Sequence, residues 1–333
     1  MKGKILVTYR IPEESLTILE NEGYTLIWPE GVSMSEAEIV EKIPECIAVV
    51  SVFATPLPDK AMEIADHLRI ISNYGAGVDN INIPFATDKG IVVTNTPDEV
   101  TEPTAEMAVA LMLALARRIP EMDRRLRSHC DIRWGIMENL GTTLRGKTLG
   151  IIGLGRIGKA TARRALALGM KIVYHNRHRA GKKTEKQLDA KYITLEALLE
   201  NSEVISLHIP LTPETHHLID KNAFGRMKPG VLIVNTARGA VIDEKALIDA
   251  LRSGQIAGAA LDVFENEPEI PEALLKMDQV VVAPHVGTAT WETRVDIGRR
   301  AALNIIEYFG GKDPVYCVNP DVLDHKSNHG FAE

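Results

Sequence analysis

The chain has 333 residues, 45% of them hydrophobic and 25% charged, which suits a globular protein of two ordinary domains, each able to bury a core. Its formal net charge of −7 disfavours non-specific binding to nucleic acid, because phosphate binding draws on clustered Lys and Arg. The three cysteines, Cys46, Cys130 and Cys317, are odd in number and form no C-x-x-C pair, which argues against both a disulfide framework and a zinc site.

The N-terminus and the apolar runs predict a cytoplasmic protein with no membrane segment. Residues 1–4 lead directly into a strand-like run at 5–7, without the hydrophobic region and cleavage site of a secretory signal. The longest clean apolar run, 107–116, is too short to span a bilayer and is typical of a buried helix. Neither a membrane nor a nucleic-acid partner is therefore expected.

Two series of short apolar runs alternate with helix-forming stretches, which predicts two parallel sheets covered on both faces. The runs of the first series are 5–7, 25–28, 47–50, 69–72 and 91–93, with helices expected at 12–21 and 35–42. The runs of the second series are 147–152, 171–174, 204–208, 231–235, 257–262 and 280–283.

Two long helical stretches, 103–118 and 291–309, flank the second series. The first is expected to have Thr101 as N-cap and Pro103 in its first turn. The simplest arrangement inserts the second series into the first, so that the last helix returns to the first domain. The predicted domains are 1–99 with 288–322 for substrate, 100–287 for cofactor, and a polar tail at 323–333. The expected fold class is α/β, with a Rossmann-type doubly wound domain inserted into a flavodoxin-like doubly wound domain.

The run 147–152 leads into three glycines, Gly153, Gly155 and Gly158, just before a helical stretch and a second strand. A tight strand-to-helix turn needs a residue without Cβ, and a pyrophosphate needs backbone close by. The helix N-terminus then offers unpaired N–H groups to the phosphates. The pattern predicts a nicotinamide dinucleotide site at this turn; the alternative is a purely structural glycine turn.

The loop after the second strand decides between the two nicotinamide cofactors. NAD-binding domains carry Asp or Glu about 20 residues past the glycines, but this chain has no acidic residue between Gly158 and Thr184. The expected position holds Asn176, Arg177 and Arg179, and guanidinium groups bind a 2′-phosphate well. We therefore predict a preference for NADPH, with NADH as the second cofactor; the alternative is a solvated basic loop.

Polar residues follow the strands of the second series at the edge of the sheet where ligands bind. Arg238 follows the run 231–235, and His285 follows the run 280–283. Reduction of a 2-oxo acid needs a cation for the carbonyl and a proton donor, which Arg238 and His285 can supply. A carboxylate from Glu267 would favour the protonated form of His285. The alternatives are a surface ion pair for Arg238 and a structural role for His285; His208 is expected to border the adenosine.

Seven short segments form a specific combination of motifs. They are residues 74–80 (YGAGVDN), 103–106 (PTAE), 153–158 (GLGRIG), 227–230 (MKPG), 235–239 (NTARG), 261–268 (LDVFENEP) and 284–287 (PHVG). With them the chain resembles the D-isomer-specific 2-hydroxyacid dehydrogenase family from about residue 4 to residue 320. Within that family it is most similar to glyoxylate/hydroxypyruvate reductases and 2-ketogluconate reductases.

The resemblance implies Arg238, Glu267 and His285 as the catalytic set. It also implies that the amides of Ala76 and Gly77 hold the substrate carboxylate. The other residues that it implies are Phe53 at the substrate, and Thr104, Leu154, Gly155, Arg156, Ile157, Thr236, Asp262 and Gly287 at the cofactor. Pro210 and Ala237, which follow His208 and Thr236 in the chain, are expected at the cofactor as well.

Two departures from relatives bear on activity and assembly. Formate dehydrogenases, which resemble this family, carry Gln where Glu267 stands, so that activity is disfavoured. Residues 128–135 differ from the usual arm sequence, which in relatives helps to form a dimer. A homodimer is expected, with Trp134 either reaching the partner's pocket or packing in the interface.

The predicted function is NADPH-preferring reduction of small 2-oxo acids to D-2-hydroxy acids. Glyoxylate, hydroxypyruvate, a 2-ketoaldonate and an apolar 2-oxo acid all stay open as substrates. No metal is expected. The alternatives are a nucleotide-sensing corepressor on the same fold and an NAD-using hydrolase that resembles adenosylhomocysteinase.

Overall fold

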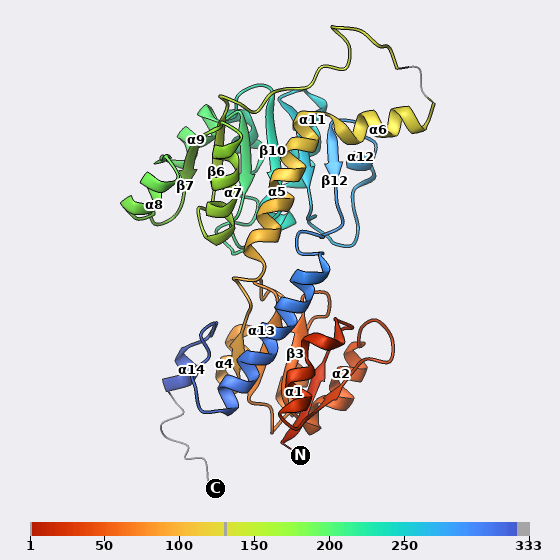
Figure 1. Cartoon of the computed structure of the whole chain (residues 1–333), viewed down its shortest axis with the longest axis vertical. Helices are drawn as coiled ribbons and strands as arrows, with labels where there is room; N and C mark the ends of the chain where they lie inside the picture. The colour runs from red at the N-terminus through yellow and green to blue at the C-terminus, as the bar shows by residue number, and fades with distance from the viewer. Residues whose placement is uncertain (1, 130–131, 325–333) are drawn as a thin grey trace. The chain divides into compact units, whose positions relative to one another are not determined.

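A computed structural model describes residues 2–129 and 132–324, so Cys130 and most of the predicted polar tail lie outside the described residues. The chain divides into two compact units, one formed by Met1–Val100 with Ala289–Glu333 and the other by Thr101–Thr288 (Figure 1). The two domain boundaries expected from the sequence, 99/100 and 287/288, each lie one residue before those of the two units. None of the helices in the described ranges is both long and apolar enough to cross a membrane.

The first unit is built on a five-stranded sheet of order β2-β1-β3-β4-β5, in which all neighbouring strands are parallel. This is the flavodoxin-like order, as predicted. The strands are β1 (Gly3–Val7), β2 (Tyr24–Ile27), β3 (Cys46–Val52), β4 (Ile70–Tyr74) and β5 (Val92–Thr94). The helices are α1 (Thr17–Asn21), α2 (Glu36–Lys42), α3 (Asp59–Ile64), α4 (Ile83–Asp88), α13 (Trp291–Phe309) and α14 (Asp321–Asp324).

Both faces of this sheet are buried, which explains why its strands are continuous apolar runs. Ile5 and Val7 belong to the core on one face together with α1 and α13, whereas Leu6 belongs to the core with α2 and α3. The long helix α13 packs closely through small residues. A Cβ at Gly298 would overlap the side chain of Ser15 in the 3-10 turn before α1, and the hydroxyl of Ser72 in β4 donates to the carbonyl of Ala301 at 2.9 Å.

The second unit is built on a seven-stranded parallel sheet of order β12-β11-β10-β9-β6-β7-β8. Numbered within the unit, the order is 7-6-5-4-1-2-3, which is the Rossmann order with one strand added. The strands are β6 (Thr148–Ile152), β7 (Lys171–His175), β8 (Ala190–Tyr192), β9 (Val204–Leu207), β10 (Val231–Asn235), β11 (Ile256–Leu261) and β12 (Val280–Val282).

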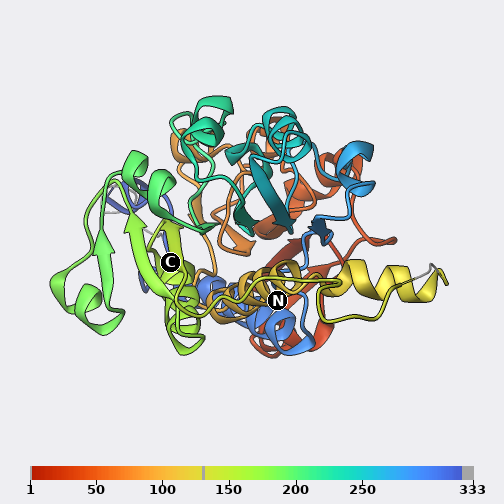
Figure 2. The ribbon, with the colours of Figure 1, turned by 90° about the horizontal axis from the view of Figure 1, so that it is seen from above.

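Helices cover both faces of the seven-stranded sheet (Figure 2). Helices α5 (Thr101–Ala116) and α7 (Arg156–Ala167) contribute to the core on one face, and α9 (Leu195–Asn201), α10 (Lys221–Arg226) and α11 (Glu244–Arg252) to the core on the other. The remaining helices are α6 (Ile119–Arg127), α8 (Lys182–Gln187) and α12 (Glu272–Leu275).

Four details of the sequence-based prediction are wrong. Strand β8 gives no apolar run, since it is a three-residue edge strand with a lysine at its centre. Helix α5 begins at Thr101 itself, so Thr101 is not the residue before the helix. Helix α6 was not predicted; it follows Arg118, whose left-handed backbone (φ 54°) separates it from α5. The helix expected at 12–21 is divided at Leu16 into a 3-10 turn and α1.

Candidate active site

The turn between β6 and α7 has the shape that a dinucleotide requires. A Cβ at Gly153 would overlap the carbonyl of His208, and a Cβ at Gly158 would overlap the carbonyl of Gly153. Only glycine therefore fits at these two close approaches. Helix α7 starts at Arg156, and its N-cap, Gly155, provides no side-chain acceptor, so its first amides face outward as an anion-binding terminus.

Asn176 supports this turn from the end of β7. The amide of Leu154 donates to Oδ1 of Asn176 at 2.6 Å, so Asn176 fixes the glycine-rich loop. It occupies the expected place of the carboxylate that binds ribose in NAD-specific domains. A neutral amide there leaves no fixed negative charge to repel a 2′-phosphate.

The two arginines that follow differ in their surroundings. Arg179 donates from Nε and Nη2 to the Glu185 carboxylate, at 2.8 Å each. The Tyr174 hydroxyl donates to the same carboxylate at 2.6 Å, and these bonds from Arg179 and Tyr174 lower the pKa of Glu185 to about 2. Arg177 is exposed; its charge acts on the Glu214 carboxyl, whose pKa is lowered mainly by hydrogen bonds from the Thr212 side chain and its own backbone, and no hydrogen bond or ion pair ties Arg177 within the described ranges. Arg177 is therefore the arginine whose guanidinium is available to an anion.

Arg238 is held at the end of β10 by a turn that Asn235 organises. Nδ2 of Asn235 donates to the carbonyl of Arg238 at 2.9 Å, and its Oδ1 accepts the Ala237 amide at 3.0 Å. A Cβ at Gly239 would overlap the carbonyl of Phe264. This backbone contact packs the Arg238 turn directly against the loop that carries Glu267.

Glu267 and His285 form a hydrogen-bonded pair at the same edge of the sheet. Nδ1 of His285 lies 2.8 Å from Oε2 of Glu267, and Oε1 accepts the amide of Phe264 at 3.0 Å. Burial alone would raise the pKa of the Glu267 carboxyl. The hydrogen bond and charge of His285, the Phe264 amide and the charge of Arg238 outweigh burial, and that pKa is lowered. Glu267 is thus an ionised acceptor near neutral pH, and Nδ1 is the donor.

Asp262 anchors the loop that presents His285. Its buried carboxylate accepts the amides of Val286 and Gly287, each at 2.8 Å, and the His285 amide donates to its carbonyl at 2.8 Å. Burial raises the pKa of Asp262, against the effect of the two amide bonds. Thr104 of α5 lies beside Gly287, so these two predicted cofactor residues are neighbours.

Two buried polar atoms at the ends of β9 and β10 have no partner among the described residues: Nδ1 of His208 and Oγ1 of Thr236. Buried polar groups are nearly always hydrogen-bonded, so both fit a polar ligand bound at this edge. Together with the Gly153 turn they give this edge of the sheet polar atoms of the kind that a dinucleotide binds. Ala237 follows Thr236 directly, and Pro210 lies two residues beyond His208.

His208 is not suited to be the general acid, and its burial makes a testable contribution to stability. Nε2 of His208 lies 2.9 Å from the Ser206 hydroxyl, and burial lowers the pKa of His208 from 6.5 to about 4. Between these two values the unfolded chain binds a proton that the folded chain does not. The free energy of unfolding is therefore expected to fall as the pH drops from 6.5 towards 4.

The measurement is urea unfolding of the wild type and His208→Gln at about pH 7 and about pH 5. The stability of the wild type relative to the variant should decrease at the lower pH. A difference that does not change with pH would contradict this assignment.

In the first unit, the loop after β4 has the form of a carboxylate site. The carbonyls of Gly75, Ala76 and Gly77 are turned inward. The Gly75 carbonyl accepts the Thr96 amide at 3.0 Å, and those of Ala76 and Gly77 accept side-chain amides from Asn95 and Asn73, at 2.8 and 2.7 Å. The amides of Ala76 and Gly77 have no acceptor among the described residues. Such a pair of open amides suits a carboxylate.

A pocket of about 550 Å³ in the first unit includes Phe53, the residue expected to shape the substrate site. Its wall also contains Tyr74, two residues before Ala76, the first of the two open amides. Sequence reasoning missed Tyr9, Arg10, Trp291 and Arg294, which also line the pocket. The spacing of Trp291 and Arg294 was the available signal, because residues three apart share a helix face.

The predicted site residues thus form two groups. The second unit collects Arg238, Glu267, His285 and the cofactor residues at the carboxyl ends of its strands. The first unit holds Phe53, Ala76 and Gly77 around one loop and pocket. That both groups serve one substrate is a prediction.

Comparison with known proteins identifies the family. Residues 109–287 match the model of the D-isomer specific 2-hydroxyacid dehydrogenase, NAD binding domain. The glyoxylate reductase of Thermococcus litoralis is 44% identical over 327 residues, 97% of this chain and 98% of that protein. The chain belongs to the D-isomer-specific 2-hydroxyacid dehydrogenase family. The glyoxylate reductase of Pyrococcus furiosus is 42% identical over 337 residues, which cover both proteins fully.

Solved structures agree with this identification of the dehydrogenase. The TT0316 protein of Thermus thermophilus superposes with a TM-score of 0.88 at 37% identity, over 95% of this chain and 99% of that one. The NADPH-dependent glyoxylate/hydroxypyruvate reductase of Sinorhizobium meliloti, in complex with NADP and malonate, has a TM-score of 0.86 at 34% identity, over 96% and 97%. This dehydrogenase is an NAD(P)-dependent oxidoreductase, and its relatives support small 2-oxo acids as its substrate class.

Proposed function

We propose that the dehydrogenase reduces small 2-oxo acids of the glyoxylate, hydroxypyruvate or 2-ketoaldonate type to D-2-hydroxy acids, with NADPH as preferred donor, in the cytoplasm. The observation that supports this most strongly is the ionised Glu267 bonded to His285, beside Arg238 at the ligand edge of a Rossmann-type sheet. Reduced nicotinamide, when bound there, supplies the hydride that becomes the C2 hydrogen of the product.

The chain's own residues prepare the keto acid for this transfer. The open amides of Ala76 and Gly77 bind the carboxylate, and Arg238 draws electron density towards the carbonyl oxygen. Glu267 holds the His285 ring by Nδ1, so that Nε2 delivers the proton to the oxygen as its negative charge develops. Asp262 keeps the His285 loop in register through its two amide bonds.

For the cofactor, the turn at Gly153 and the N-terminus of α7 would hold the pyrophosphate through Leu154–Ile157. His208 and Thr236 supply polar atoms that lack other described partners. We assign the 2′-phosphate first to Arg177, because Arg179 would have to give up its bidentate pair with Glu185. Asn176 stands where NAD-specific domains have a carboxylate, so no negative charge at this position repels that phosphate.

The cofactor assignment predicts unequal effects of two matched substitutions. Arg177→Ser should lower kcat/KM for NADPH about 10- to 100-fold, the usual weight of a charge-assisted hydrogen bond. It should leave kcat/KM for NADH nearly unchanged. Arg179→Ser, the control, should have the smaller effect on NADPH. Equal or better use of NADH by the wild type would contradict the assignment.

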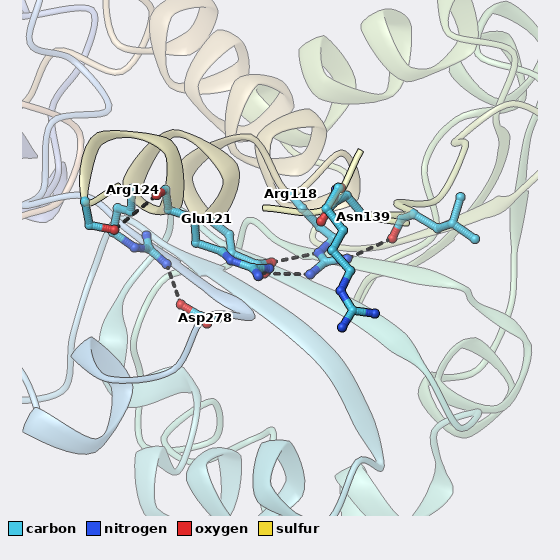
Figure 3. A network of polar contacts seen from close by, with 9 residues as sticks. Arg118, Glu121, Arg124, Asn139 and Asp278 are labelled. Atoms are coloured by element: carbon cyan, nitrogen blue, oxygen red, sulfur yellow. Dashed lines mark hydrogen bonds and ion pairs between the residues drawn. The ribbon is translucent and has the colours of Figure 1, made fainter. Parts of the chain in front are cut away.

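A homodimer is the proposed assembly. Segment 119–140 exposes large apolar side chains, among them Ile119, Leu126, Trp134 and Ile136, with Trp134 89% exposed. At its base, Arg118 donates to the buried Glu121 carboxylate at 2.6 and 2.7 Å (Figure 3). Contact with a second copy would cover these side chains, and Trp134 would pack there or reach the partner's pocket.

Substrate assays test the function against its two alternatives. NADPH consumption, followed by absorbance, should occur with at least one of glyoxylate, hydroxypyruvate, a 2-ketoaldonate and an apolar 2-oxo acid. NADPH binding without consumption with any of the four would favour a nucleotide-sensing corepressor. Release of adenosine from adenosylhomocysteine, with no net change in a bound NAD, would favour the hydrolase.

A further inference from the structure

We propose that His216, His217 and Glu265 form a binding site for a zinc-type divalent metal ion, close to the loop that carries Glu267. One ligand atom from each of the three side chains lies within 4.8 Å of the other two. Nε2 of His217 is already 2.8 Å from Oε1 of Glu265. The cluster lies within the second unit, and it runs against the expectation of no metal drawn from the cysteines.

The backbone explains how two successive histidines come to share one site. Both histidines lie at the end of the turn 213–217, and His217 has a left-handed backbone with φ 51°. As a result the two imidazole rings stack, with their centroids 4.0 Å apart and an interplanar angle of 27°. The His217 amide donates to the carbonyl of Ala240 at 2.8 Å, which fixes this conformation.

Glu265 is held in place from the other side of the cluster. Its amide donates to Oε1 of Glu244, a buried side chain at the start of α11, at 2.9 Å. His217 and Glu265 are both half-buried, while His216 is exposed. Two of the three ligands are therefore pre-positioned, and the third can rotate towards an ion without disturbing the core.

The donor set selects the class of ion. Two imidazoles and one carboxylate, with water in the fourth position, are a recurrent tetrahedral set for Zn²⁺. Imidazole disfavours Mg²⁺ and Ca²⁺, which take oxygen ligands. Metal–ligand distances of about 2.0–2.1 Å place tetrahedral donors roughly 3.4 Å apart. The His217–Glu265 contact thus opens by about half an ångström, and the ion replaces the proton between these two atoms.

A bound ion would affect the catalytic loop because one of its ligands, Glu265, belongs to that loop. Glu265 stands two residues before Glu267, and Oε1 of Glu267 accepts the amide of Phe264. An ion that joins Glu265 to His216 and His217 clamps this short loop to the segment after β9. Binding should therefore stabilise the folded chain.

The test is calorimetric titration of the untagged full chain with Zn²⁺ in a buffer free of chelators. The wild type should bind one Zn²⁺ per chain with a micromolar Kd, and its Tm should rise with Zn²⁺ concentration. His216→Gln, an exposed change that spares the fold, should weaken binding at least about 10-fold. His67→Gln, an exposed histidine of the first unit, is the matched control and should bind as the wild type does.

Co²⁺ offers a second readout, since a four-coordinate site with two imidazoles gives visible absorption that His216→Gln should abolish. Absence of binding to the wild type at about 100 µM Zn²⁺, well above a micromolar Kd, would overturn the proposal. An unchanged Kd in His216→Gln would overturn it equally. Neither measurement depends on reductase activity, so this result stands apart from the proposed reaction.

Discussion

Replacement of His285 by Gln is expected to lower kcat by about 10²–10⁴-fold, the usual contribution of a general acid. Gln keeps a polar side chain of similar size but cannot release a proton to the developing alkoxide. The Kd for NADPH should stay close to that of the wild type, because the predicted contacts of the phosphates and ribose lie on other loops. Steady-state kinetics with the best 2-oxo acid and fluorescence titration with NADPH measure the two effects separately.

Glu267→Gln serves as the companion variant. Its amide can still contact Nδ1 of His285 but carries no charge, so the imidazolium loses its ionised partner. The kcat of Glu267→Gln should fall, but by less than that of His285→Gln, because the amide still holds the ring and no longer compensates its charge. Near-normal turnover of His285→Gln would refute the role of His285 as acid, whatever the turnover of Glu267→Gln.

Replacement of Arg238 by Met is expected to lower kcat/KM for the 2-oxo acid by about 10²–10³-fold, as for loss of a donor to a developing oxyanion. Met fills a similar volume without a charge or a donor. Arg238→Lys should recover only part of this loss, since a single ammonium group cannot reproduce the planar, bidentate guanidinium.

The control for Arg238→Met is a measurement of its stability, which shows whether the turn still folds. Asn235 and Gly239 set this turn through backbone contacts, so Arg238→Met should unfold at nearly the wild-type urea concentration. If Arg238→Met is stable and retains kcat/KM within about threefold of the wild type, Arg238 does not stabilise the transition state.

Much of the fold could be predicted because strands that are buried on both faces appear in the sequence as uninterrupted apolar runs. The three glycines identified the ligand end of the second sheet, since a Cβ at Gly153 or Gly158 would overlap backbone. Strand β8 escaped prediction because no apolar run marks Ala190–Tyr192, which is a strand through its parallel pairing with β7. Helix α6 escaped because the left-handed Arg118 that precedes it has no signature in a non-glycine residue.

The site was predictable where chemistry follows topology. Arg238 and His285 end parallel strands, so the sheet itself brings them to one edge. Contacts that depend on loop geometry were not predictable. The pair of Arg179 with Glu185 and the stacking of His216 on His217 each require a local backbone conformation that residue types alone do not specify. The pocket at Trp291 and Arg294 joins segments far apart in the chain.

A crystal structure of the dehydrogenase with NADPH and oxalate, an unreactive analogue of glyoxylate, tests the central claim most directly. One oxygen of oxalate should lie within about 3.2 Å of both the Arg238 guanidinium and Nε2 of His285, with the other carboxylate on the amides of Ala76 and Gly77. Oxalate bound beyond hydrogen-bonding reach of either Arg238 or His285 would contradict the account.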